Sequence, residues 1–274
     1  MRLVRKAAEE ANLERPGRVA TGVDVIGDLA IIRLDGLTRP EKKRLAEAIL
    51  KEVKNVAGVF DQEGGIEGEY RLRTLKHLAG EERTMTLHRE NGCVFKVDVA
   101  KCYFSPRLST ERLRIAKEVT RREKVLNMFA GVGPFSIPIA RSSSARVTSC
   151  EINELACTLH EENDRLNKVD QLVEVIRGDA LELPARVDSR FDRVLMPHPS
   201  QADRFLPTAL ALTKKGGLIH YYRHVLGRDD EEATESIRAE LSGLLPNTAT
   251  YQLRRVRAVG PRWVEMAADV RVGA

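Results

Sequence analysis

In the first part of the chain, hydrophobic and polar positions follow patterns typical of short strands and one helix. A short apolar run at Leu29–Leu34 and the alternation of apolar and polar residues at Cys93–Val99 predict strands, and residues 40–53 place apolar side chains at helical spacing. Asn91-Gly92 lies between two alternating stretches and is typical of a two-residue hairpin turn. Glycines between residues 64 and 69 predict a turn. The pattern predicts a small α+β domain over about residues 1–100.

Beyond this point apolar strands alternate with helical segments. A helix is expected from Ser109 to Lys117, with serine or threonine available as its N-cap. The strand candidates that follow are Val125–Phe129, Arg146–Cys150, Val173–Ile176, Asp192–Met196 and Gly217–Tyr222. This alternation predicts an α/β domain, residues 101–274, in which helices cover both faces of a parallel sheet. Two final strands, Gln252–Val256 and Val264–Val272, are expected to lie antiparallel at its edge.

Composition narrows the class of protein. The 274 residues are 42% hydrophobic and 31% charged, as in a globular protein with a core. No apolar run reaches the roughly 20 residues that span a bilayer, and the first ten residues lack a signal-peptide core, so we expect a cytoplasmic protein without a membrane partner. None of the four cysteines forms a CxxC pair, so we expect buried thiols and no metal. The net charge of +5 permits a nucleic-acid partner, although a solvated basic face explains it equally.

A glycine pair is the first candidate for a binding site. Gly131 and Gly133 follow an apolar strand and precede a helical segment. Glycine allows a sharp turn and a close approach to a ligand, and a strand end beside a helix N-terminus is the usual crevice of an open α/β sheet. The dinucleotide fingerprint has a third glycine where Ser136 stands here. Taken alone, the loop either binds a nucleotide or only connects a strand to a helix.

Polar residues at the ends of the next strands favour the binding site. Glu151 ends the second strand, and a carboxylate there can accept hydrogen bonds from both ribose hydroxyls of a nucleoside. Asp179 follows the third strand and can accept from an adenine amino group. Each alone is more often a helix cap or a loop residue, but their joint order predicts a nucleoside site. Ser136 disfavours a pyrophosphate, so the set resembles a Rossmann-like class I S-adenosylmethionine-dependent methyltransferase.

Longer blocks refine this resemblance. They are Thr86–Lys101, Cys102–Arg112, Asn127–Ile137 and Gly216–Tyr222. The chain, from about residue 20 onward, is similar to the archaeal and eukaryotic tRNA (guanine-37-N1) methyltransferase family. A close relative in the wybutosine pathway transfers the aminocarboxypropyl group of the same cofactor to tRNA. The resemblance implies a tRNA-modifying enzyme whose small domain meets the anticodon region, and we expect a monomer.

The resemblance also implies residue roles. Glu111 would be the general base that takes the N1 proton of guanine, because protonated N1 is a poor nucleophile. Arg71, with Arg73 as its neighbour, would hydrogen-bond the guanine O6, and Tyr103 would shape the target-base pocket. Without the resemblance, residues 107–112 are better explained as a capped helix with surface ion pairs.

The same resemblance implies the cofactor contacts. Ser105, Arg107 and Arg112 would lie near the methionine end of the cofactor, where an arginine can pair with the carboxylate. The remaining contacts would come from Phe129, Gly131, Gly133, Glu151, Ile152, Asp179 and Ala180.

Two departures from the family leave the transferred group open. The fourth strand ends in Pro197-His198-Pro199, where the family has Asn-Leu-Pro with an asparagine that contacts the base. That role is either lost, moved to His198 or taken by backbone carbonyls, since proline has no side-chain donor. The aminocarboxypropyl relative has Gly-Tyr there. Methyltransferases of the family commonly carry an extra N-terminal domain, and the sequence lacks a counterpart, as the relative does.

We weigh the glycine loop and the segment around Arg71 most heavily and predict methyl transfer. Aminocarboxypropyl transfer to a wyosine precursor is the first alternative, and an inactive tRNA-binding homologue is the second. Candidate phosphate contacts are Lys101, Arg121, Arg122, Lys124, Arg254, Arg255 and Arg257.

Overall fold

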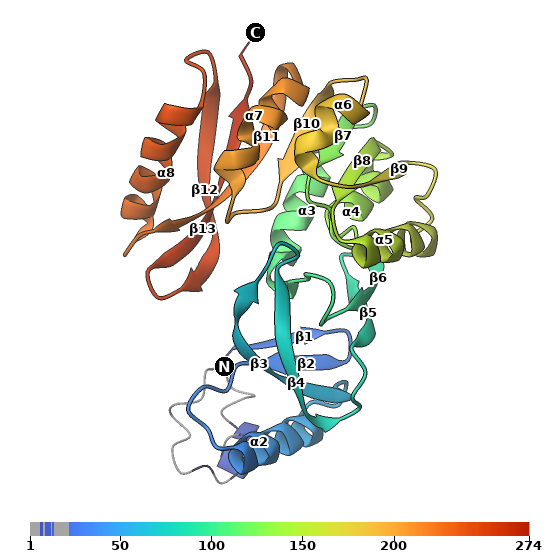
Figure 1. The fold of residues 1–274 in the computed structure, drawn as a ribbon, viewed down its shortest axis with the longest axis vertical. Coiled ribbons are helices and arrows are strands. Elements are labelled where there is room, and N and C mark those ends of the chain that lie inside the picture. The colour runs from blue at the N-terminus through green and yellow to red at the C-terminus, as the bar shows by residue number, and fades with distance from the viewer. Residues whose placement is uncertain (1–5, 8, 12, 14–21, 274) are drawn as a thin grey trace. The chain divides into compact units, whose positions relative to one another are not determined.

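The computed structural model describes residues 6–7, 9–11, 13 and 22–273. The chain divides into two compact units, Met1–Thr110 and Glu111–Ala274 (Figure 1). We describe each unit by itself.

The first unit contains a four-stranded sheet in the order β1-β2-β3-β4. The strands are β1 (Val23–Ile26), β2 (Leu29–Ile32), β3 (Gly58–Glu67) and β4 (Leu72–Gly80). β2 and β3 are parallel and are connected by α2 (Arg39–Glu52), whereas the other pairs are antiparallel. Leu45 and Ile49 of α2 are buried against Ile32 and Val59 of the sheet, so the apolar stripe read from the sequence faces this core.

A separate hairpin follows, made of β5 (Met85–Glu90) and β6 (Cys93–Asp98). Asn91 and Gly92 have φ angles of 49° and 73°, the left-handed conformation that a type I′ turn requires, and the predicted hairpin is confirmed. The turn expected within residues 64–69 is wrong in part, because β3 runs to Glu67. The pairing with β4 shifts between Glu63 and Ile66, so the glycines accommodate a bulge inside a strand. The sequence did not indicate β4.

The second unit is built on a seven-stranded sheet in the order β12-β13-β11-β10-β7-β8-β9. The strands are β7 (Lys124–Asn127), β8 (Arg146–Glu151), β9 (Val173–Arg177), β10 (Phe191–Met196), β11 (Thr213–Leu226), β12 (Thr250–Gly260) and β13 (Trp263–Arg271). β7 to β11 are parallel, while β13 pairs antiparallel with β11 and β12 with β13. The predicted parallel sheet with an antiparallel edge is confirmed.

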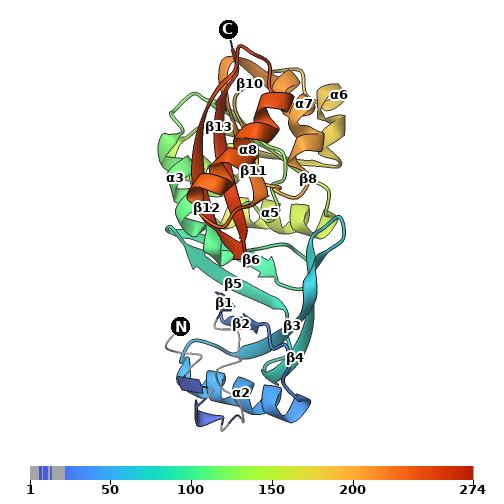
Figure 2. The same cartoon turned by 90° about the vertical axis from the view of Figure 1, so that its left-hand side faces the viewer.

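Helices cover both faces of this sheet (Figure 2). They are α3 (Ser109–Glu118), α4 (Ser136–Ser143), α5 (Glu154–Leu166), α6 (Leu183–Arg186), α7 (Ala202–Leu212) and α8 (Asp230–Leu244), with the 3-10 turn η3 (Ala180–Glu182). A further 3-10 turn, η2 (Pro106–Leu108), belongs to the first unit. Successive strand residues point to opposite faces. Accordingly, the hydroxyl of Tyr221 donates to Glu240 of α8, and that of Tyr222 donates to Glu111 of α3.

The second unit has the hydrophobic core that the composition predicts, and the cysteines of the chain are buried as expected. Leu126, Val194 and Ile219 of neighbouring strands are fully buried and pack with Phe205 of α7 and Ile237 of α8. The four cysteines are free and buried, as expected. Over the described residues, no helix combines the length and apolarity needed to cross a membrane.

Candidate active site

The glycine loop follows β7 and is hydrogen-bonded to the end of the neighbouring strand β8. Gly131 has a φ of 54° and its N–H donates to Glu151 Oε2 at 2.7 Å, while Asn153 N–H donates to Glu151 Oε1 at 2.9 Å. Burial raises the pKa of Glu151, and these backbone donors oppose the shift. The carboxylate therefore lies at the carboxyl end of β8, held beside the loop as the sequence predicted.

Asp179 lies at the end of the next strand. Gly178 N–H donates to the Glu151 carbonyl at 2.9 Å, which joins this turn to the end of β8. Asp179 Oδ1 accepts from Leu181 N–H at 2.9 Å and caps η3, where Ala180 is buried. The capping role that the sequence left open is therefore present, and Oδ2 has no hydrogen-bond partner among the described residues.

Gly133 and Ser136 have packing roles that the sequence did not show. A Cβ at Gly133 would lie 2.6 Å from the ring of His160, and the φ of 91° is in the left-handed region, so glycine is needed here for the turn and for close packing on α5. Ser136 is fully buried, and its Oγ lies 3.1 Å from Asn127 Nδ2 and 2.8 Å from Ser149 Oγ. A third glycine at position 136 would leave these two polar groups without their partner.

A buried pair beneath the loop gives a pH-dependent prediction. His160 Nε2 lies 3.5 Å from Asp164 Oδ1, and burial, with Asp170 and Glu161 nearby, raises the pKa of Asp164 to about 8. The unfolded chain releases this proton near pH 4, so folding is increasingly disfavoured as pH rises from about 4 to 8. We expect Asp164→Asn, which cannot ionise, to melt at a higher temperature than the wild type at pH 8 and to lose part of the decline between pH 6 and 8. If the melting temperatures of the two proteins change with pH by the same amount over this range, the assignment is wrong.

Glu111 lies in the first turn of α3, on the opposite face of the sheet from α8. Its side chain is buried, and Oε1 accepts from Tyr222 Oη at 2.7 Å and from Arg114 Nη2 at 2.7 Å. Oε2 accepts only from Arg114 Nε, at 3.1 Å, among the described residues. Tyr222 also packs against Phe135 of the glycine loop, with ring centres 6.1 Å apart. The Glu111 carboxylate is thus fixed near the loop, and its Oε2 accepts fewer hydrogen bonds than its Oε1.

Arg114 connects Glu111 to a larger network. Its guanidinium also binds Glu118 at 2.6 Å and Asp269 at 2.9 Å, so it has two carboxylate partners besides Glu111. Asp269 in turn binds the buried His220 Nδ1 at 2.5 Å. Glu118, His220 and Asp269 place ligand atoms within 4.8 Å of one another, but guanidinium groups already bind the two carboxylates, so we do not assign a metal site to them.

The end of β10 meets the glycine loop through aromatic contacts. The ring of His198 lies 5.0 Å from that of Phe129, which in turn packs edge-on against Phe205 of α7 at 4.8 Å. His198 and the half-buried Pro197 therefore lie beside the loop. Ile152 is half-buried just after β8. Arg112 is buried, with its guanidinium carbon 5.9 Å from the ring centre of Phe135.

The remaining predicted site residues belong to the first unit. Arg71 has a φ of 54°, in the left-handed region, and its guanidinium carbon lies 4.6 Å from the ring centre of Tyr103. A non-glycine residue in this conformation is uncommon and often marks a functional position. Ser105 is buried at the start of η2.

Arg73 and Arg107 share a carboxylate that the sequence analysis missed. Arg73 Nη2 donates to Asp24 Oδ2 at 3.0 Å and to the carbonyl of Phe104 at 3.2 Å, and its side chain is only 6% exposed. Arg73 is therefore buried and already paired within the first unit, and its place in the base pocket stays a prediction. Arg107 donates through Nε to Asp24 Oδ1 at 2.6 Å, and its half-exposed guanidinium can still bind an anion.

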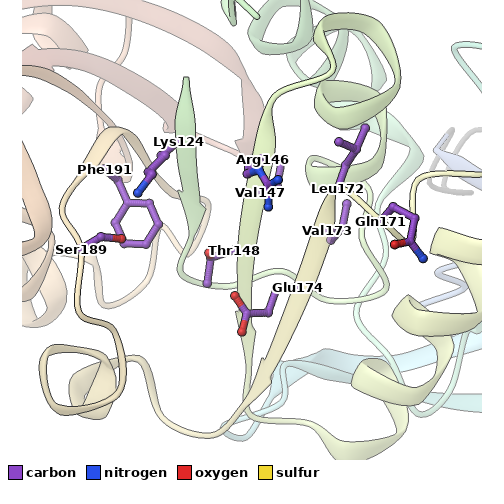
Figure 3. Close-up of a pocket in the computed structure, with 10 residues that line it drawn as sticks. All are labelled: Lys124, Arg146, Val147, Thr148, Gln171, Leu172, Val173, Glu174, Ser189 and Phe191. Carbon is purple, nitrogen blue, oxygen red and sulfur yellow. The ribbon is translucent and has the colours of Figure 1, made fainter. Parts of the chain in front are cut away.

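A cavity of 240 Å³ lies elsewhere in the second unit (Figure 3). Lys124, Arg146 and Glu174 line it, at the amino ends of strands β7, β8 and in β9. Ligands of open α/β sheets bind outside the carboxyl ends, where Gly131 and Glu151 lie. This cavity is therefore not part of the candidate active site.

Comparisons with known proteins agree with this arrangement. The sequence profile of the TRM5/TYW2 methyltransferase domain matches residues 86–240. The chain belongs to the TRM5/TYW2 family. The TYW2 N-terminal domain matches residues 7–84.

Relatives with different names occur within the TRM5/TYW2 family. The tRNA (guanine(37)-N(1))-methyltransferase Trm5b of Pyrococcus abyssi is 41% identical over 92% of this chain and 75% of its own length. The tRNA 4-demethylwyosine(37)-methyltransferase Taw21 of Saccharolobus solfataricus is 33% identical over 91% and 93%. The tRNA(Phe) (4-demethylwyosine(37)-C(7)) aminocarboxypropyltransferase of Pyrococcus horikoshii is 38% identical over 73% and 70%.

Solved structures of the family share the fold. The complex of aTrm5 with tRNALeu has a TM-score of 0.83 at 36% identity and covers 94% of this chain and 73% of its own. The structure of P. horikoshii TYW2 in complex with MeSAdo has a TM-score of 0.75 at 28% identity and covers 98% and 97%.

Proposed function

We propose that this protein transfers the methyl group of S-adenosylmethionine to N1 of guanine 37 in tRNA. The relative with 41% identity carries this activity in its name, and the match extends over most of both chains. The observation that carries the proposal is the buried Glu111 carboxylate, which Tyr222 and Arg114 orient at the start of α3. A tRNA substrate agrees with the cytoplasmic location and the monomeric state expected from the sequence.

The side chains at the strand ends fit the cofactor. Glu151 offers carboxylate oxygens to ribose hydroxyls, and Asp179 keeps Oδ2 for an adenine amino group. The apolar ring of Phe129 and the turn at Gly131 border the same region. S-adenosylmethionine supplies a methyl group activated by a sulfonium.

The chemistry assigned to the chain is the removal of a proton. Guanine N1 is a nucleophile only after it loses its proton, and Glu111 Oε2, with its single donor, is the atom that accepts it. Arg114 then remains paired with Glu118 and Asp269, so protonation of Glu111 does not leave a buried cation without a partner. Arg71 and Tyr103 remain the proposed contacts to the target base.

Tyr222 gives a test of how Glu111 is positioned. Tyr222→Phe removes a hydrogen bond to a charged group, which is worth about 1.5 to 3 kcal/mol, and we expect kcat to fall by about 10- to 100-fold. The KM values for tRNA and cofactor should change little, because Tyr222 acts through Glu111. Tyr221→Phe is the matched control, since this buried hydroxyl binds Glu240 on the other face of the sheet. Equal losses of kcat in the two variants would indicate a purely structural effect.

Labelled cofactor identifies the transferred group. The protein is incubated with unmodified tRNA and S-adenosylmethionine that is labelled either on the methyl group or on the carboxyl group. Transfer of the methyl label alone supports the proposal, whereas transfer of the carboxyl label identifies aminocarboxypropyl transfer. Binding of tRNA without transfer of either label would identify an inactive homologue.

Two observations favour other reactions of the same family, so the test includes the substrate of those reactions. The TYW2 N-terminal domain matches residues 7–84, which favours aminocarboxypropyl transfer. The match to Taw21 covers 93% of that protein, which favours methyl transfer to 4-demethylwyosine. The labelling experiment is therefore repeated with tRNA that carries 4-demethylwyosine. If the protein strongly prefers this tRNA, 4-demethylwyosine and not guanine is the target base.

A further inference from the structure

Two exposed apolar side chains, one of them aromatic, lie side by side on β11 and β13, and none of the assigned roles uses them. Trp263 begins β13 and is 44% exposed, and its partner in β11, Leu226, is 48% exposed. The partner in β12 is Gly260, which has no side chain to cover the indole ring. Large apolar side chains exposed together commonly mark a binding surface.

This surface lies on the same face of the sheet as Glu111. The register of β11 and β13 is continuous and pairs Tyr222 with Ala267, His224 with Glu265 and Leu226 with Trp263. Alternate residues of a strand share a face, and four residues extend about 13 Å, so Leu226 lies about 13 Å along the strand from Tyr222 on the face that meets Glu111.

Two ion pairs lie between these points. Arg254 Nη2 lies 3.1 Å from Asp269 and 4.0 Å from Glu111, and Arg257 Nε lies 2.6 Å from Glu265. In both pairs the arginine is the more exposed partner, at 35% against 20% for Arg254 and 19% against 3% for Arg257. The arginine is therefore the more accessible side of each ion pair. The acidic N-terminus of α8 lies on the opposite face of the sheet, because α8 packs on the side that contains Tyr221.

We propose that Trp263, Leu226, Arg254 and Arg257, called here the Trp263 face, bind the tRNA next to its target base. An unpaired nucleotide that neighbours the target stacks on the indole, and phosphates contact the two arginines. Aromatic side chains that stack unpaired bases, with arginines along the backbone, are the usual means of binding single-stranded RNA. The inference rests on the proposed function, because it takes tRNA as the substrate.

The chain offers a direct probe, because Trp263 is its only tryptophan. We expect unmodified tRNA to quench its fluorescence and to protect it from acrylamide. Stacking of one base accounts for about a 5- to 100-fold change in affinity, so Trp263→Ala should weaken tRNA binding and raise the KM for tRNA by a factor in this range. The KM for the cofactor should not change, and Trp263→Phe should restore most of the affinity. Leu166→Ala, at a 53% exposed apolar position at the end of α5, is the matched control and should bind tRNA normally.

The possible outcomes distinguish a failure of the proposed tRNA-binding surface from a failure of the proposed reaction. If Trp263 stays accessible to acrylamide in saturating tRNA and Trp263→Ala binds tRNA normally, the inference is wrong, even when product forms. If tRNA protects Trp263 but no product forms with any tRNA, the surface stands and the proposed reaction fails. Emission that depends on protein concentration, together with a dimer in sedimentation, would assign the surface to a second copy of the chain and overturn the inference.

Discussion

Glu111→Gln is expected to lower the single-turnover rate by about 10²- to 10⁴-fold, the usual contribution of a positioned general base. Glutamine keeps the shape of the side chain and an oxygen that accepts from Tyr222 or Arg114, but it cannot take the N1 proton of guanine. The measurement is rapid-quench kinetics with enzyme in excess over tRNA, and binding of S-adenosylhomocysteine should remain normal.

Glu118→Gln is the control for this change. Glu118 lies on the same helix and binds the same Arg114 guanidinium at 2.6 Å, but its side chain is 41% exposed. We expect the control to retain most of the rate. A Glu111→Gln enzyme within a few-fold of the wild type would remove Glu111 from the role of base.

Glu151→Ala is expected to have the largest effect on the cofactor. The change removes the two proposed hydrogen bonds to the ribose and also the bond from Gly131 N–H that holds the loop. Hydrogen bonds to a charged group are worth about 1.5 to 3 kcal/mol each, so we expect the Kd for S-adenosylhomocysteine to rise by about 100-fold or more. Isothermal titration calorimetry measures the change, and a thermal melt confirms that the variant is folded.

Glu154→Ala is the matched control, because this glutamate lies three residues further on, at the start of α5, and is 78% exposed. Its loss should leave the cofactor affinity unchanged. If the two variants bind the cofactor equally well, Glu151 does not hold the ribose.

The parts of the site that the sequence predicted follow from one feature of the fold. The carboxyl ends of parallel strands meet at one edge of the sheet, so polar residues that end successive strands come together. Glu151 and the loop at Gly131 are joined by a hydrogen bond for this reason. The alternation of strands and helices was sufficient to place them, although neither residue was identified by its type alone.

The parts that the sequence did not predict depend on contacts between distant segments. Nothing near Arg73 indicates that Asp24 holds it in the first unit, and only the fold shows the φ of 91° and the neighbouring His160 ring that explain why residue 133 is glycine. The contact between Arg114 and Glu111 could have been predicted from the sequence, because side chains three residues apart on a helix are neighbours. Tyr222 comes from a strand far along the chain, so its contact with Glu111 was visible only in the fold.

Nucleoside analysis of the tRNA product tests the central claim most directly. The protein is incubated with S-adenosylmethionine and two transcripts, one with guanosine at position 37 and one with adenosine there. The RNA is digested, and its nucleosides and fragments are identified by mass spectrometry. The account predicts 1-methylguanosine at position 37 of the first transcript and none in the second. An aminocarboxypropyl adduct, a methyl group elsewhere in the tRNA, or equal modification of both transcripts would contradict it.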